Sequence, residues 1–289
     1  MLINIGIDET ELGRYEQAAR HQQEALVLFR DIGDRFGEAR ELDNLGWARQ
    51  RQDRNQEAVG YHQQSLDLFR EIGDRQGEAF ALSRLGVIDL RLARYQHAAE
   101  YLRHALGLFR GMGNASNEAQ CLIRLGEVYV ELGSHEQAAG NFDQALTMSR
   151  EIGDRVLEAD ALNGLGEVLF RTGDADKPRV HHADALRLAS EADAPREQAR
   201  AHAGLARACQ ADGNPVQVRY HWQEALTRYA TIGAPKASEI RDRLASAGNG
   251  GDGDNQAEED GGTPASPPDD LSSAPGNPGA PKAAQIPAP

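Results

Sequence analysis

Lysine, cysteine and long apolar runs are scarce in this chain of 289 residues, and each scarcity narrows what the protein can do. Its two cysteines, Cys121 and Cys209, lie far apart with no second cysteine near either, so the sequence holds no metal-binding or redox motif built on paired cysteines. No apolar run reaches the roughly 20 residues that a membrane-spanning helix needs. The first residues lack the basic start and cleavage site of a secretory signal peptide. We therefore expect a cytoplasmic protein that does not enter a membrane.

Short motifs that carry enzyme chemistry are absent as well. The sequence has no phosphate-binding Gly-x-x-x-x-Gly-Lys-Ser/Thr loop, no Gly-x-Ser-x-Gly elbow and no His-Glu-x-x-His pair. Some histidines recur at register positions, such as His181 and His221, but no column of further ligands joins them, and a zinc ion needs three or four protein ligands. Glu127 and Glu167 recur on neighbouring repeats, where we expect solvated charges rather than a general acid. The sequence thus predicts no enzyme, no metal and no cofactor.

Negative charge is concentrated at the C-terminus of a chain whose net charge is −14. Residues 247–289 are rich in proline and glycine, with hardly a large apolar side chain beyond Leu271 and Ile286. Such a segment cannot bury enough apolar surface to offset the entropy lost on ordering, so we predict a disordered acidic tail. Because both the tail and the rest of the chain are acidic, we expect no direct binding of nucleic acid. The acids of this tail are Asp252, Asp254, Glu258, Glu259, Asp260, Asp269 and Asp270.

Before the tail, the sequence repeats itself with a period of 40 residues. Leucine recurs at one position of every block, and glycine follows it in all blocks but the last, where alanine stands. A second alanine column and a second leucine column keep the same register without a gap. These columns are Leu45, Leu85, Leu125, Leu165 and Leu205; Gly46, Gly86, Gly126, Gly166 and Ala206; Ala39, Ala79, Ala119, Ala159 and Ala199; and Leu66, Leu106, Leu146, Leu186 and Leu226.

Each block has the apolar spacing of two amphipathic helices. The second helix ends in an Ile-Gly-Asp-Arg turn, as at Ile32 to Arg35, in which the glycine suits a left-handed C-terminal position and the aspartate suits the cap of the next helix. At the other turn, Ser134 is predicted to cap the following helix. Pro195 and Pro215 suit first helical positions, whereas Pro178 stands about one turn inside its helix and predicts a shifted start.

The blocks predict the following organisation. A solenoid of helix pairs occupies residues 1–246, followed by the tail at 247–289. Leu2, Ile5 and Gly6 fall in the columns of Leu42, Leu45 and Gly46, so the chain begins inside a first helix; this is either a short natural helix or, as we favour, the mark of missing upstream sequence. The predicted units are a partial repeat at 1–35, repeats at 36–75, 76–115, 116–155, 156–195 and 196–235, and a cap helix at 236–246.

Leu45-Gly46, Ala58 twelve residues later and Ser65 seven residues further resemble the tetratricopeptide repeat signature, which usually recurs about every 34 residues. The longer period here resembles the arrays of cell-polarity adaptors. It is also similar to the C-terminal arrays of large bacterial ATPase-type transcription regulators, including the antibiotic-regulatory type in actinobacteria. The resemblance implies an all-α, right-handed superhelical solenoid of antiparallel helix pairs that binds a protein or peptide.

In tetratricopeptide arrays the first helices line a concave groove, and the resemblance carries those positions onto this chain by register. The early repeats then offer arginines around aromatic and aliphatic side chains, and the middle repeats offer acids. Of the polar types used by the family's clamp for a C-terminal carboxylate, only Asn163 is present, which disfavours that role. The predicted partner-binding residues are Arg40, Asp43, Trp47, Arg51, Phe80, Ser83, Val87, Leu90, Arg91, Ile123, Glu127, Glu131, Asn163, Glu167, Phe170, Arg171 and Arg207.

An apolar strip flanked by arginines suits an amphipathic helix or an extended peptide with apolar anchors and acids. The alternative for Trp47 and Phe80 is packing between helices; for the whole strip we favour binding. We therefore predict a scaffold or adaptor for a protein partner. The alternative is a sensor segment of a larger bacterial transcription or signalling regulator whose N-terminal domains precede Met1. The acidic tail is a further candidate ligand for the basic end of the groove. No sequence feature indicates a particular oligomeric state.

Overall fold

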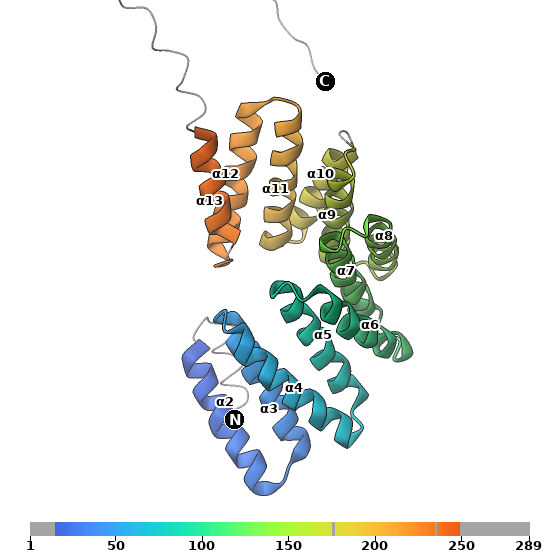
Figure 1. Ribbon diagram of the computed structural model, residues 1–289, viewed down its shortest axis with the longest axis vertical. Coiled ribbons are helices and arrows are strands. Elements are labelled where there is room, and N and C mark those ends of the chain that lie inside the picture. The colour runs from blue at the N-terminus through green and yellow to red at the C-terminus, as the bar shows by residue number, and fades with distance from the viewer. Residues whose placement is uncertain (1–14, 175–176, 235, 249–289) are drawn as a thin grey trace, which may run out of the picture.

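A computed structural model describes residues 15–174, 177–234 and 236–248, and Figure 1 shows their arrangement. These residues form helices α2 to α13 and contain no strand. The predicted helix around Leu2, Ile5 and Gly6 and the predicted tail from residue 249 onward lie outside the described residues. The helices are α2 (Tyr15–Ile32), α3 (Arg35–Arg51), α4 (Asn55–Ile72), α5 (Arg75–Arg91), α6 (Tyr95–Gly111), α7 (Ala115–Glu131), α8 (His135–Ile152), α9 (Arg155–Arg171), α10 (Lys177–Glu191), α11 (Pro195–Ala211), α12 (Pro215–Thr231) and α13 (Lys236–Gly248).

Consecutive helices pack as pairs, and the pairs follow one another along a curved path (Figure 1). The first helices α3, α5, α7, α9 and α11 begin at matching positions of the 40-residue register, and each packs on the second helix that follows it. Each second helix also packs on the next first helix, so helix packing is continuous from α2 to α13. The predicted all-α solenoid is confirmed.

The Ile-Gly-Asp turns form as the sequence predicts. Gly33, Gly73 and Gly153 have φ of 72°, 75° and 71°, the left-handed region in which glycine carries no steric cost. The aspartate that follows caps the next first helix; for example, Gly37 donates its N–H to Asp34 Oδ1 at 2.9 Å. Ser134 stands at the N-cap position of α8 as predicted, but its side chain makes no capping hydrogen bond there.

The glycine column exists because a large side chain of the second helix fills the space that glycine leaves. A Cβ at Gly126 would lie 2.6 Å from Cζ of Phe142, and a Cβ at Gly164 would lie 2.3 Å from Cε1 of the same ring. Phe142 on α8 is therefore held between the backbones of α7 and α9. His182 on α10 has the same place between Gly166 and Gly204. Glycine at these positions permits the close helix approach on which the stack depends.

A charged contact recurs at four junctions between a second helix and the next first helix, from α2–α3 to α8–α9. The arginine near the end of the second helix donates Nε–H to a glutamate in the first turn that follows, as in Arg70 with Glu78 at 2.8 Å. Arg30 with Glu38, Arg110 with Glu118 and Arg150 with Glu158 repeat it at 2.8, 2.7 and 2.8 Å.

The described part of α10 begins at Lys177, immediately before Pro178. Residues 175 and 176 lie outside the described residues, so the predicted shift of this helix start stays a prediction. At the end of the stack, α13 buries Ile240 against Trp222 and Tyr229 of α12, with Ala237 and Leu244 packed beside it. The last pair α11–α12 thus receives one further helix over its apolar face.

Candidate functional site

The first helices share one face of the curved stack, which we call the inner face. Two ion pairs demonstrate this directly, because each joins first helices of different repeats. Arg124 on α7 lies 2.9 Å from Asp160 on α9, and Arg200 on α11 lies 3.1 Å from Glu127 on α7. Side chains at the same register position of α3 to α11 therefore follow one another along this face.

One register column shows how the inner face changes along the stack. In the first two repeats the column holds Trp47 and Val87, which are half-buried. Among the described residues, neither joins any of the apolar clusters that hold the helices together. In the next three repeats the same column holds Glu127, Glu167 and Arg207, so it passes from apolar to charged.

The acids in the middle of the inner face are neutralised by arginines. Glu127 lies 2.7 Å from Arg124 and 3.1 Å from Arg200, and Asp160 is bound by the same two arginines. Burial would raise the pKa of the Glu127 carboxyl, but Arg124 and Arg200 outweigh burial and hold it well below its ordinary value. The groups are therefore charged and mutually bound. The prediction of an acidic, solvated middle groove is wrong.

The same holds one repeat further along. Glu167 lies 2.8 Å from Arg171 Nε and 2.6 Å from Arg207 Nη2. Arg171 also approaches Glu131 at 3.5 Å, and the guanidinium of Arg207 lies over the ring of Phe170, 5.1 Å from its centre. These side chains, although placed on the inner face as expected, are engaged with one another.

Two predicted contact residues are not accessible to a partner. Ile123 has no exposed surface and belongs to the core cluster of α7 to α11. Asn163 is only 2% exposed; it donates to the Glu197 carbonyl at 3.1 Å and its Oδ1 lies 3.0 Å from His182 Nδ1. The physical reason is that α7, α9 and α11 pack closely along the inner face, more closely than α3 does on α5. Ile123 and Asn163 are thus structural residues.

In the early repeats, two further side chains are engaged inside the stack. Asp43 lies 2.8 Å from His62 Nδ1 and 3.0 Å from Arg84 Nε, and these partners lower its pKa against the opposing effect of burial. Phe80 packs edge to face on Phe109 at 5.2 Å between ring centres. The remaining predicted residues of these repeats lie at or near the surface: Arg40, Arg51 and Arg91 are exposed, and Ser83 and Leu90 are half-buried.

Comparison with known proteins agrees with this geometry. Two tetratricopeptide repeat models match the sequence, one over residues 1–71 and 44–111 and another over residues 119–152. The chain carries tetratricopeptide repeats. A search of curated protein sequences finds no match.

Several solved tetratricopeptide-like structures share the fold. BtubC from P. vanneervenii is 18% identical with a TM-score of 0.61, and the alignment covers 89% of this chain and 99% of that one. A Rap protein complexed with competence and sporulation factor is 15% identical with a TM-score of 0.63, covering 86% and 74%. The STAND protein PH0952 from Pyrococcus horikoshii is 20% identical with a TM-score of 0.64, covering 85% of this chain but only 38% of that one. At these identities the likeness shows the fold alone.

Three histidines of the tetratricopeptide stack, His62, His182 and His202, are buried and serve packing. His62 and His182 are buried beside Gly46 and Gly166, and burial lowers the pKa of His182 to about 3, so it is neutral. His202 Nδ1 lies 3.0 Å from Nδ1 of His221. Burial, together with the charge of Arg228, lowers the pKa of His202 to about 4. Within the described ranges, no three His, Cys, Asp or Glu side chains are grouped as metal ligands.

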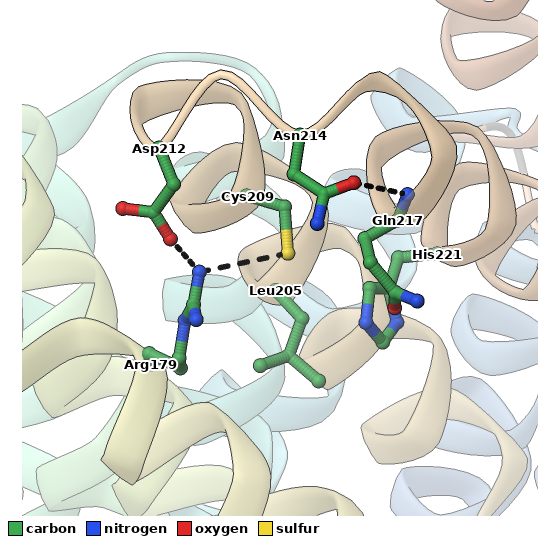
Figure 2. Close-up of a pocket in the computed structure, with 7 residues that line it drawn as sticks. All are labelled: Arg179, Leu205, Cys209, Asp212, Asn214, Gln217 and His221. Atoms are coloured by element: carbon green, nitrogen blue, oxygen red, sulfur yellow. Dashed lines mark hydrogen bonds and ion pairs between the residues drawn. The ribbon is translucent and has the colours of Figure 1, made fainter.

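A hollow of about 420 Å³ lies between α10 and the α11–α12 turn, and Figure 2 shows the residues that line it. Arg179 is ion-paired with Asp212 and lies 3.8 Å from Cys209 Sγ, while Asn214 accepts the N–H of Gln217 at 3.2 Å. Its arginine is therefore already neutralised. Sequence reasoning had not marked this hollow, because its lining residues come from three helices at irregular register positions.

None of the described helices has the length and apolar character needed to cross a membrane.

Cys209 lines the hollow, whereas the second cysteine of the chain, Cys121, is buried in the stack. Burial raises the pKa of the Cys121 thiol to about 11, which keeps it protonated and unreactive.

Proposed function

We propose that the inner face of the early repeats binds a peptide or a segment of a partner protein, and that the protein acts as a non-enzymatic scaffold or adaptor. The observation that carries the proposal is the apolar pair Trp47 and Val87. These side chains lie outside the core clusters of the described helices, next to the exposed arginines Arg51 and Arg91. Large side chains that the fold itself does not use are the anchors that binding surfaces provide.

The chemistry of this surface indicates the kind of ligand. Trp47 and Val87 favour apolar anchor residues, and Arg51 and Arg91 at the ends of α3 and α5 favour acids beside those anchors. An amphipathic helix or an extended segment with this composition matches both features. NprR, whose structure in complex with its cognate peptide NprX shares this fold at 16% identity, supports a peptide ligand by analogy.

The charges of the later repeats support a non-catalytic role. Arginines hold the pKa of Glu127 and of Glu167 low, against the effect of burial, so neither carboxyl carries a proton for general acid catalysis near neutral pH.

The test begins with selection of peptides from a random display library on the immobilised full-length protein. We expect selected peptides that combine apolar residues with Asp or Glu, and we expect a loss of about tenfold or more in affinity for the variant Trp47→Ala/Val87→Ala. The matched control is Val180→Ala on the second helix α10, a side chain that is 60% exposed. Equal affinities for the double variant and the control, with unchanged helix content, would count against this surface.

A second candidate is a sensor array within a larger regulator. The specific observation is the likeness to PH0952, a STAND protein described as having a tetratricopeptide repeat sensor, of which this chain covers 38%. An ATPase or DNA-binding domain encoded in frame upstream of Met1 would favour this role. An in-frame stop codon directly before Met1 would argue against it.

A further inference from the structure

Basic residues from three distant parts of the chain stand at helix ends that border the inside of the curved stack. Arg91 ends α5, Arg196 is in the first turn of α11, and Lys236 begins α13; all three are exposed. In Figure 1 the starts of α11 and α13 point toward the ends of α3 and α5 across the inside of the curve. We call Arg91, Arg196 and Lys236 the basic cluster.

The charge of Arg196 acts on both other members of the cluster. The pKa of Arg91 is lowered by burial and by the charges of Arg196 and Arg124. The pKa of Arg196 is lowered by the charge of Arg124 and by burial, and that of Lys236 by burial and by Arg200 and Arg196. Burial and neighbouring positive charges thus act on all three cations, and binding of an anion beside them would offset both effects.

The acids near the cluster do not neutralise it. Among the described residues, no ion pair joins Arg91, Arg196 or Lys236 to a carboxylate. Glu127 and Asp160 behind them are bound to Arg124 and Arg200.

Two further acids act on the cluster. Glu239 raises the pKa of Lys236, although it also pairs with Arg243 at 2.8 Å, and Glu197 raises the pKa of Arg196 while burial raises its own pKa. Asp53 acts on Arg91 only at a distance. The cluster is thus a local excess of positive charge in a chain whose net charge is −14.

We propose that the basic cluster is a binding site for a carboxylate-rich peptide segment, and that its occupant is the acidic stretch of this same chain between Asp252 and Asp270. The inference rests on the proposed function, because the tail would occupy the inner face and compete there with a partner's acids. Charge complementarity is the first argument: seven acids lie between Asp252 and Asp270, and no basic residue lies among them.

Reach is the second argument. Lys236 begins α13, whose 13 residues rise by about 20 Å, so the tail leaves the stack about that far from the cluster. From Gly248 to Glu258 an extended chain spans up to about 35 Å. The Glu258-Glu259-Asp260 triplet therefore reaches back to Lys236 within one molecule. A tether of this length also gives a high effective concentration.

The scarcity of lysine provides a sharp test, since the chain has only Lys177, Lys236 and Lys282. A carbodiimide joins a carboxylate to an amine in direct contact, with no spacer. Treatment of the full-length protein at low concentration, followed by peptide mapping of the monomer band, should give amides between Lys236 and Glu258, Glu259 or Asp260. Lys177 should not give these products. Raising the salt concentration to roughly 0.5 M should reduce the yield severalfold.

Variants keep the reacting groups in place while they weaken the site. Arg91→Ala/Arg196→Ala retains Lys236 and every tail acid, and it should lower the Lys236 crosslink severalfold. Arg103→Ala/Arg219→Ala removes the same charge from exposed positions on second helices and should leave the yield unchanged. Products found only in dimers, or equally at all three lysines, would overturn the intramolecular contact.

Binding of a selected peptide, measured on the same samples, separates this inference from the proposed function. Absence of the Lys236 crosslink while the peptide still binds would refute the tail contact and leave the groove intact. A crosslink that depends on Arg91 and Arg196, with no peptide binding at Trp47 and Val87, would support the tail contact and refute the proposed function.

Discussion

Arg124 and Asp160 form a buried ion pair across two repeats, with Arg124 Nη2 2.9 Å from Asp160 Oδ2 and exposed fractions of 7% and 2%. Together with Arg200 and Glu127, the pair joins α7, α9 and α11 into one unit. Contacts between first helices of successive repeats are what give a solenoid its stability beyond that of single repeats. Ion pairs between first helices thus stabilise the middle of this protein in addition to its apolar core.

Removal of Arg124 should therefore be costly. Arg124→Met leaves the buried Asp160 and the half-buried Glu127 with only Arg200 between them, and we expect a loss of about 3 kcal/mol in the free energy of unfolding, measured by urea denaturation. Arg124→Met/Asp160→Leu should recover part of the loss, because an apolar pair needs no counter-charge. Arg103→Met, at an exposed outer position, should change stability by less than about 0.5 kcal/mol. A similar effect for Arg124→Met and Arg103→Met would show that the pair is dispensable.

Two helical glycines form a matched pair for the packing argument. Gly126→Ala places a Cβ 2.6 Å from the Phe142 ring, which is fixed from the other side by Gly164, so we expect destabilisation by about 2 kcal/mol. Gly140 is an exposed position of α8, and a Cβ there would have no atom within 4 Å. Gly140→Ala should therefore stabilise the protein by about 0.5–1 kcal/mol. Thermal unfolding followed by circular dichroism measures both. Stabilisation by Gly126→Ala would contradict the close approach of α7 and α8.

Glu41 is a buried carboxyl in a column otherwise filled by alanine and cysteine. Its side chain has no exposed surface and its Oε2 has no hydrogen-bond partner, so burial raises its pKa to about 6 from 4.5. Because the folded state holds the proton more tightly, the stability from this group is fully present below pH 4.5 and is lost as the pH rises through 6. At pH 7 the loss is roughly 2 kcal/mol.

Glu41→Gln should accordingly stabilise the protein at pH 7, and the gain should vanish near pH 4.5. Unfolding of both proteins across this pH range measures the effect, and Glu24→Gln on α2, an exposed position, is the control. A gain that does not depend on pH would mean that the Glu41 carboxyl is already neutral, or already solvated, at pH 7.

Sequence reasoning reached the architecture because local signals determine it. The Leu45-Gly46 column and the Gly33-Asp34 turn each specify a helix position or a helix end from neighbours in sequence. The inner face was harder to predict, because Arg200 meets Glu127 only through the curvature of the whole stack. Register alone also placed Ile123 and Asn163 in the groove, although close packing of α7, α9 and α11 buries both. One signal was present: Gly164 and Gly204 replace the Asn44, Arg84 and Arg124 of earlier repeats, which marks tighter packing there.

The central claim, that the inner face of the early repeats binds a peptide segment, is tested most directly by hydrogen exchange with mass spectrometry on the full-length protein, with and without a saturating selected peptide. We predict slower exchange in α3 and α5, around Trp47 and Val87, and unchanged exchange in the outer helices α8 and α10. Protection confined to the outer helices, or to the hollow lined by Arg179 and Asp212, would contradict the account.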